Sequence, residues 1–163
     1  MSEQSFGPDL PMTREMFVTV LGRLHEAGGV AAAGDPSGFG DAAADSYYAR
    51  YVAWASENDI VQGMGSDHFG VGAPVTREQM IVFVYRYFLF QNLIKDAGAG
   101  ELEGYQDTNN VSPWAADAFG WAVGQGLITG RSSDLLDPSG QSSRAEVAMF
   151  ILRCFNMIYE DTI

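Results

Sequence analysis

The sequence contains the same short helix-start signal three times, and this repeat constrains the fold more than any other feature. Each copy has a hydroxyl residue, an arginine and then an apolar run with helical spacing, and the copies begin at Thr13, Thr76 and Ser143. A hydroxyl residue is a favoured N-cap because its oxygen accepts a hydrogen bond from a free backbone N–H of the first turn. The repeat therefore predicts three equivalent long helices.

Two of the three signals also predict a capping box. In such a box, Glu or Gln three residues after the cap accepts a hydrogen bond from the N–H of the cap residue itself. Ser143 is followed by Glu146 and Thr76 by Gln79, whereas the copy at Thr13 has a methionine at that place. We therefore expect two helix starts with complete boxes and one without.

The arginine of each signal, Arg14, Arg77 or Arg144, lies where the positive end of the helix dipole disfavours a cation. Two explanations are open. The guanidinium could join the free N–H groups of the first turn in binding an anion, or it could fold back onto a neighbouring aspartate. The repetition makes these arginines candidate ligand-binding residues, together with the cap hydroxyls of Thr76 and Ser143.

Each long helix carries a second arginine nine residues after the first. These are Arg23, Arg86 and Arg153. Nine residues are about half a turn out of phase at 3.6 residues per turn, so we expect the second arginines to face away from the first set. We also expect them to favour the negative helix C-terminus and to pair with carboxylates of other units.

A second repeated motif precedes the later two signals. An aromatic-x-Asp sequence opens each segment, and short amphipathic helices are predicted at 47–58 and 114–125, which align on a Trp-Ala pair. Asp59 and Gly126 lie where a left-handed residue would end such a helix. The aspartates and tryptophans of the two segments are Asp41, Asp107, Trp54 and Trp121.

The repeating unit is therefore a short helix, a loop and a long helix. A helix-loop-helix unit cannot bury its own faces, so we expect an all-α domain in which three units pack around a pseudo-threefold core of long helices. The first short helix is missing, and we expect the stripe of Met16, Phe17 and Val20 to be more exposed than its counterparts. The predicted units are 1–29, 39–94 and 105–160, and the predicted connectors are 30–38 and 95–104.

Composition excludes several classes of function. A length of 163 residues with 47% hydrophobic residues fits one domain, and a net charge of −12 argues against binding nucleic acid. No run approaches the ~20 apolar residues of a membrane-spanning helix, and the single Cys154 can form no internal disulfide. Metal-ligand and catalytic motifs such as HExxH or CxxC are absent from the sequence, which predicts a chain without enzyme activity, metal or cofactor.

Taken together, the motifs resemble the S-layer homology module. That module has an aromatic-x-Asp opening, a helix with Trp-Ala, a Gly-Ile-x-x-Gly-like turn, Phe-x-Pro, and Thr-Arg-Ala-Glu at the start of a long helix. The resemblance covers nearly the whole chain, and the second and first units depart from the pattern more than the third. The third unit matches at Tyr105, Asp107, Trp114, Trp121, Gly126, Leu127, Ile128, Gly130, Leu136, Pro138, Ser143, Arg144, Ala145 and Glu146.

The resemblance implies a pseudo-threefold helical prism that attaches a surface protein non-covalently to the bacterial cell wall, outside the cell. The implied ligand is a secondary cell-wall polysaccharide, often capped by a pyruvate ketal whose carboxylate would suit an arginine at a helix N-terminus. Because the third unit is the most complete, we expect Arg144 to contribute most to binding, then Arg77, then Arg14.

The remaining candidates each have two open interpretations. Asp41 and Asp107 could accept hydrogen bonds from sugar hydroxyls or cap the following turn. Trp54 and Trp121 could stack on a sugar or belong to the core, where aromatic residues of such helices are more often found. The chain as a whole has an alternative function, as a degenerate module for protein assembly at the surface whose first unit is completed by a partner.

Overall fold

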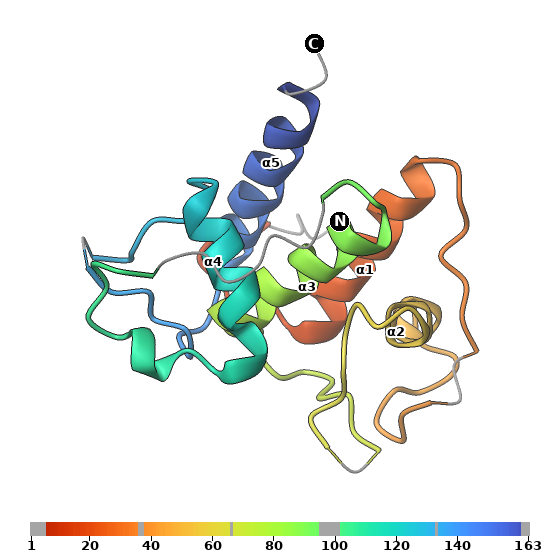
Figure 1. Cartoon of the computed structure of the whole chain (residues 1–163). Helices are drawn as coiled ribbons and strands as arrows, with labels where there is room; N and C mark the ends of the chain where they lie inside the picture. The colour runs from red at the N-terminus through yellow and green to blue at the C-terminus, as the bar shows by residue number, and fades with distance from the viewer. Residues whose placement is uncertain (1–5, 36–37, 66, 95–101, 133, 161–163) are drawn as a thin grey trace.

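The computed structural model describes residues 6–35, 38–65, 67–94, 102–132 and 134–160, with only the backbone for 158–160. Within these ranges the chain is helical and has no strand, as the repeat predicts (Figure 1). Most of the predicted connector 95–104 lies outside the described residues. None of the described helices is long and apolar enough to cross a membrane. The helices are α1 (Arg14–Ala27), α2 (Ala49–Glu57), α3 (Arg77–Phe90), α4 (Ala116–Gly124) and α5 (Arg144–Glu160), with 3-10 turns η1 (Thr108–Asn110) and η2 (Pro113–Ala115).

The three long helices begin at the repeated signal, and the predicted caps are confirmed. Complete boxes stand at the starts of α3 and α5. Thr13 makes no cap bond, and its hydroxyl instead donates to Glu15 at 2.6 Å. The box bonds run from Gln79 N to Thr76 Oγ1 (3.3 Å), Thr76 N to Gln79 Oε1 (3.3 Å), Glu146 N to Ser143 Oγ (3.2 Å) and Ser143 N to Glu146 Oε2 (2.8 Å).

A closed ring of backbone hydrogen bonds joins the three helix starts. Met12 donates to the carbonyl of Ser142 at 3.0 Å, Ser142 to Val75 at 3.0 Å, and Val75 back to Met12 at 2.8 Å. These residues occupy corresponding positions one residue before the cap. Each unit thus gives and receives the same bond, which relates α1, α3 and α5 by an approximate threefold axis.

Each short helix packs on the long helix of the preceding unit. In Figure 1, α2 lies beside α1 and α4 lies beside α3. The contact is aromatic in both cases, since Trp54 stacks on His25 at 4.9 Å between ring centroids and Trp121 meets Phe88 edge-on at 6.2 Å. Asp59 and Gly126 end these helices with φ of 56° and 65°, as predicted.

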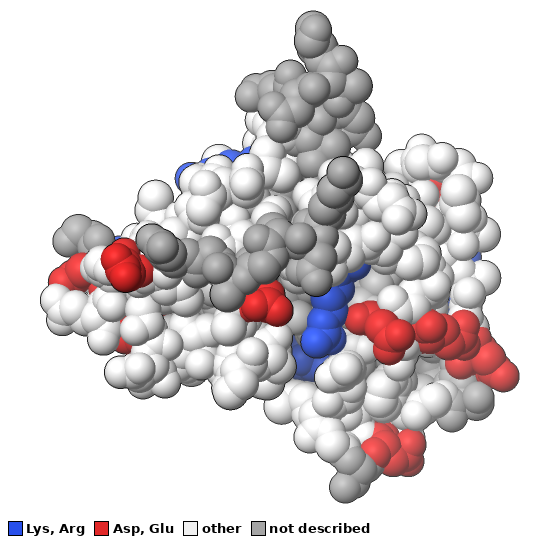
Figure 2. Space-filling view, in the orientation of Figure 1, with Lys and Arg blue, Asp and Glu red and all other residues white. Residues whose placement is uncertain are grey.

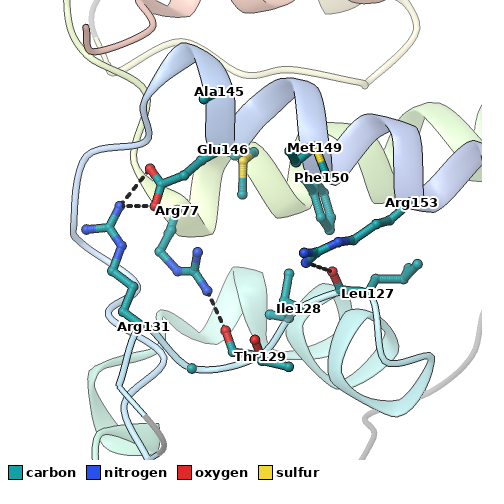
Figure 3. Close-up of a pocket in the computed structure, with 12 residues that line it drawn as sticks. Arg77, Leu127, Ile128, Thr129, Arg131, Ala145, Glu146, Met149, Phe150 and Arg153 are labelled. Atoms are coloured by element: carbon teal, nitrogen blue, oxygen red, sulfur yellow. Dashed lines mark hydrogen bonds and ion pairs between the residues drawn. The ribbon is translucent and has the colours of Figure 1, made fainter. Parts of the chain in front are cut away.

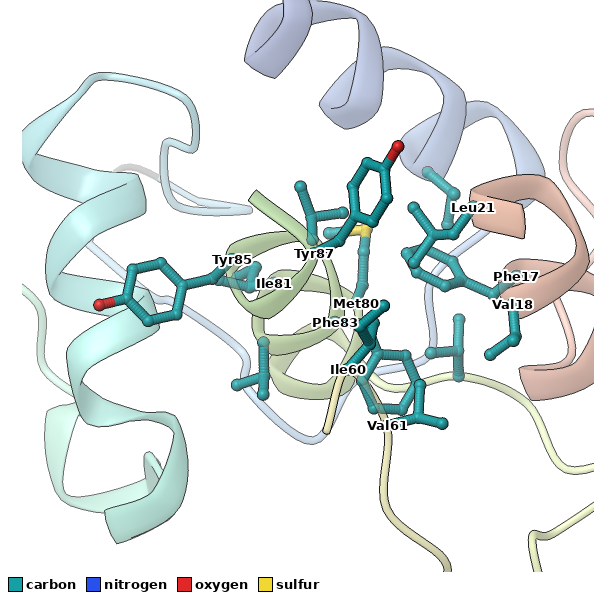
Figure 4. Close-up of a cluster of buried hydrophobic side chains, with 14 of the residues drawn as sticks. Phe17, Val18, Leu21, Ile60, Val61, Met80, Ile81, Phe83, Tyr85 and Tyr87 are labelled. Carbon is teal, nitrogen blue, oxygen red and sulfur yellow. The ribbon is translucent and has the colours of Figure 1, made fainter. Parts of the chain in front are cut away.

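The core lies between the long helices and the turns that follow the short ones. Figure 4 shows side chains of α1 and α3 meeting there, with Tyr85 pointing toward α4. Burial of these groups supplies the main driving force for folding. The largest fully buried side chains are Phe17, Phe69, Phe88, Phe119, Leu21, Ile60, Met80, Ile81, Leu136, Val18, Val52 and Val61.

The predicted exposure of the first long helix is wrong for Phe17, which is 0% exposed. Val20 is more exposed than its buried counterparts Phe83 and Phe150, as expected. The reason for the error is the packing order described above. Because a short helix covers the long helix of the unit before it, α2 covers α1 and α4 covers α3, and among the described residues no short helix covers α5.

Candidate functional site

Three grooves of the structure each contain one arginine of the start signal and one second arginine from another long helix. Their volumes are about 310, 410 and 330 Å3. Figure 2 shows one face, on which basic atoms form a column near the centre, with a row of acidic side chains beside it and other acidic side chains elsewhere. We name the grooves after their first arginine. The pairs are Arg14 with Arg86, Arg77 with Arg153, and Arg144 with Arg23.

The buried start-signal arginines hold neighbouring units together, which explains a cation at a helix N-terminus. The guanidinium of each donates two hydrogen bonds to backbone carbonyls in loops of the following unit, and neither bond involves an aspartate. The bonds run from Arg14 Nε to Phe69 O (2.8 Å), Arg14 Nη2 to Gln62 O (2.7 Å), Arg77 Nε to Leu136 O (2.8 Å) and Arg77 Nη2 to Thr129 O (3.1 Å).

Burial at these two positions is nearly complete, with Arg14 2% and Arg77 6% exposed. Burial lowers the pKa of Arg14 to about 10, against the opposing effect of Asp41 and Glu15. Burial also lowers the pKa of Arg77. A pKa of about 10 leaves the Arg14 guanidinium charged at neutral pH, so it remains a charge-assisted donor to its two carbonyls.

Arg144 occupies the same position but is less engaged. Its Nη1 donates to the carbonyl of Phe6 at 2.8 Å, and its Nη2 lies 3.8 Å from the sulfur of Met16. The carbonyls that correspond to those of Gln62 and Thr129 have no counterpart among the described residues of the first unit. Arg144 is also half-buried rather than buried. Among the described residues, its guanidinium therefore has fewer backbone carbonyl partners than that of Arg14 or Arg77.

The expectation that the second arginines face away from the first set is wrong, because each of them lines a groove with a first arginine of another long helix, although not with that of its own helix. Because of the way the units pack, each second arginine points into the groove that contains a first arginine of another unit. The sequence alone did not predict this arrangement. Figure 3 shows this for Arg77 and Arg153, with Arg153 donating to the carbonyl of Leu127 at 3.3 Å. Within the described part of the chain, none of the second arginines forms the predicted ion pair with a carboxylate of another unit.

Three exposed aromatic side chains border the grooves and were not among the sequence candidates. Phe6 is 62% exposed and lines the Arg144 groove. Trp114 is 50% exposed beside the Arg14 groove, and Tyr47 is 57% exposed beside the Arg144 groove. Both occupy the opening position of a short-helix segment, which was the available signal. Burial raises the pKa of Tyr47, and Glu15 adds to this effect, while the nearby charges of Arg23 and Arg144 oppose it.

The Arg77 groove differs because it carries its own carboxylate. Arg131 forms an ion pair with Glu146 at 2.9 Å (Figure 3). It also pairs with Asp137 at 2.7 Å. Burial alone would raise the pKa of Glu146, but the N–H of Ser143 and the charge of Arg131 lower it. The ionised Glu146 thus lines this groove together with Arg131, and the ion pair between them offsets the charge of the carboxylate.

The other sequence candidates make contacts within the protein. Asp41 accepts three backbone hydrogen bonds at 2.7–2.9 Å and Asp107 accepts two at 2.8 Å, all from the loop before the long helix of the same unit. Trp54 and Trp121 are 3% and 4% exposed, which assigns both to the core. The hydroxyls of Thr76 and Ser143 are occupied by their cap bonds.

Comparison with known families identifies the repeat. The S-layer homology domain model matches residues 38–81 and 104–148, more than half of the chain. The chain belongs to the S-layer homology domain family. This family is known for anchoring proteins at the cell surface, and membership places this chain at the cell surface. The S-layer homology domain is itself a non-catalytic module.

Relatives of this S-layer homology chain are much longer proteins. A cell surface protein of Thermoanaerobacter kivui is 34% identical over 115 residues, which are 71% of this chain and 15% of that protein. A surface-layer 125 kDa protein of Lysinibacillus sphaericus is 26% identical over 152 residues, 91% of this chain and 12% of that protein. An amylopullulanase of Thermoanaerobacterium thermosulfurigenes is 24% identical over 151 residues, which are 93% of this chain and 8% of that protein. This chain spans at most 15% of the length of these relatives.

Proposed function

We propose that this S-layer homology chain anchors a surface protein non-covalently by binding an anionic, pyruvylated secondary cell-wall polysaccharide. The observation that carries the proposal is the Arg144 groove. It combines a half-buried guanidinium that has a single carbonyl partner among the described residues, a second cation at Arg23, and the exposed ring of Tyr47. A carboxylate would lie between the two cations, and the apolar face of the sugar would lie on the ring.

The proposal also revises the expected order of the three arginines. Motif completeness places Arg77 before Arg14, but the Arg14 groove is bordered by the exposed Trp114, whereas no exposed aromatic side chain lines the Arg77 groove among the described residues. An exposed indole offers a surface on which the apolar face of a sugar can lie. We therefore propose that Arg144 contributes most, then Arg14, then Arg77.

Calorimetry with an acidic and a neutral glycan tests this function. We expect the pyruvylated glycan to bind and the same glycan without its ketal carboxylate to bind much more weakly. Arg144→Lys should bind the acidic glycan about tenfold or more weakly, since lysine keeps the charge but loses the planar fork, and a charge-assisted hydrogen bond contributes ~1.5 to 3 kcal/mol.

Arg50→Lys is the matched control, because Arg50 is exposed and does not line these grooves. It should bind as the wild type does. Equal affinity of the wild type for both glycans would refute the anion site, as would an Arg144→Lys variant that binds the acidic glycan as tightly as the wild type.

A further inference from the structure

Each groove is lined by a side chain from the first turn of another long helix, in addition to its two arginines. This side chain stands three residues after the cap residue of that helix. In two grooves it carries an oxygen that accepts the N–H of its own cap residue, and in the third it carries a thioether sulfur. The residues are Gln79 in the Arg14 groove, Glu146 in the Arg77 groove and Met16 in the Arg144 groove.

The sulfur of Met16 lies against the guanidinium of Arg144. The distance from Arg144 Nη2 to this sulfur is 3.8 Å, whereas Nη1 of the same guanidinium donates to the carbonyl of Phe6 at 2.8 Å. A thioether sulfur is a weak acceptor, and a carbonyl oxygen is a strong one. A carboxylate in this groove would therefore take the Nη2 donor from the sulfur more easily than it would take Nη1 from the carbonyl.

Oxidation would put an oxygen atom on this sulfur. A peroxide transfers one oxygen to the sulfur lone pair while its O–O bond breaks, so the sulfur loses two electrons and the peroxide leaves as water. The new oxygen would stand within hydrogen-bond distance of Arg144 Nη2. Because the corresponding side chains Gln79 and Glu146 already carry oxygens, the fold accommodates an oxygen acceptor at this position.

Met16 can be reached by a small oxidant, because it is half-buried and lines the groove. Two other methionines are more open, with Met64 60% and Met149 49% exposed, while Met80 is only 1% exposed. Oxidation of methionine follows exposure. Peroxide should therefore modify Met64 and Met149 first, Met16 next, and leave Met80 intact.

We propose that Met16 is a site of reversible oxidation, and that its sulfoxide closes the Arg144 groove to an anionic ligand by accepting the hydrogen bond of Arg144 Nη2. A methionine sulfoxide reductase restores the thioether by oxidising two thiols to a disulfide and releasing the oxygen as water. The effect on ligand binding rests on the proposed function, whereas the contact between sulfoxide and guanidinium does not.

Mass spectrometry tests the oxidation and the contact without any glycan. Limited treatment of the full chain with hydrogen peroxide should add one oxygen to Met16 under conditions that leave Met80 intact. Phenylglyoxal modifies accessible guanidinium groups, and it should then label Arg144 severalfold more slowly. Met16→Gln places an amide oxygen at this position without an oxidant and should slow the labelling in the same way. The exposed Arg50 is the internal control and should be labelled at an unchanged rate.

Calorimetry with the pyruvylated glycan tests the effect on binding. The starting chain carries Met64→Leu and Met149→Leu, which remove the more exposed methionines of the other two grooves. Peroxide should weaken its affinity about tenfold, as expected for the loss of one charge-assisted hydrogen bond, and sulfoxide reductases should restore it. When Met16→Leu is added, the affinities before and after peroxide should be equal.

Three results would overturn the proposal. The first is an intact Met16 after complete oxidation of Met64, and the second is labelling of Arg144 at the same rate with and without the sulfoxide. The third is a loss of affinity on peroxide treatment that persists with Met16→Leu. If the untreated wild type does not bind the glycan, the proposed function fails, whereas slower labelling of Arg144 would still support the sulfoxide contact.

Discussion

At the scale of single residues, the start-signal arginines combine a structural and a ligand-binding role in different proportions. Within the described part of the chain, Arg14 and Arg77 each donate two hydrogen bonds to backbone carbonyls of the next unit, whereas Arg144 donates one to a backbone carbonyl. Hydrogen bonds to backbone fix a side chain in place, and donors left over are free to meet a ligand. The start-signal arginine thus mainly holds neighbouring units together in the first two units, whereas in the third unit it is better placed to bind a ligand.

This division predicts unequal effects on stability. Arg77→Lys should lower the free energy of unfolding by about 2 kcal/mol, because lysine reaches one carbonyl and leaves the other buried without its donor. Arg144→Lys should cost less than about 1 kcal/mol, because a single partly exposed carbonyl is involved. Urea denaturation of both variants checks this. Equal losses would contradict the difference in engagement.

A second residue-scale prediction concerns acid. Burial raises the pKa of Asp41, but the N–H groups of Val71, Phe69 and Gly70 outweigh it and lower the folded-state pKa below its ordinary value of 3.8. A depressed carboxyl pKa stabilises the fold above the unfolded-state value, and this stabilisation is lost as pH falls through the folded-state pKa.

Asp41→Asn should therefore be less stable than the wild type near neutral pH, and the gap should narrow below about pH 4. Denaturation from pH 2 to 7 measures the gap. Asp45→Asn, at an exposed position, provides the comparison and should show a small gap throughout. A gap for Asp41→Asn that stays constant down to pH 2 would contradict the role of the ionised carboxyl.

At the scale of elements, local signals set the helix starts. The complete boxes of α3 and α5 and the incomplete one of α1 were readable from the sequence because each involves residues three apart. Such bonds form in any chain that makes the first turn, whatever packs around it. Packing between elements has no such local record, which is why the exposed stripe was expected on α1 and is found on α5.

The boxes give an element-scale prediction. Ser143→Ala removes an oxygen that accepts from Glu146 N and should destabilise by ~1 kcal/mol. Thr13→Ala should cost less, because its hydroxyl makes no cap bond and donates to Glu15 instead. Chemical denaturation of the two variants, side by side, gives the ranking. A larger loss for Thr13→Ala would contradict it.

At the scale of the whole molecule, the three units form a closed ring rather than a linear stack. Repeats that contact only their neighbours can unfold from one end, but here the third unit also bonds to the first, through Arg144 and the ring at Met12, Val75 and Ser142. We expect a single cooperative unfolding transition. Urea curves followed by tryptophan fluorescence and by far-UV circular dichroism should coincide, and two separated transitions would contradict the closed ring.

The sequence accounts for the fold class, the repeat and the helix ends, since periodicity and caps are local. It also located the three arginines that line the grooves. It missed Arg23, Arg86 and Arg153 as groove residues because their partners come from other units. It selected Trp54 and Trp121 over Tyr47 and Trp114 because residue type does not reveal which face of a short helix is buried. Both the groove positions of these arginines and the burial of these aromatic residues depend on the order in which the units pack.

The pairing of the first unit with the last also determines how the molecule carries force. Leu10 and Pro8 accept hydrogen bonds from Arg144 N and Ala145 N, each at 3.0 Å, so the two ends of the ring are fastened to each other. Tension applied between the N-terminal loop and the far end of α5 therefore loads this seam before it reaches the core. The force that the seam resists depends on the direction of pulling. It is low when the hydrogen bonds open one at a time and higher when they are sheared together.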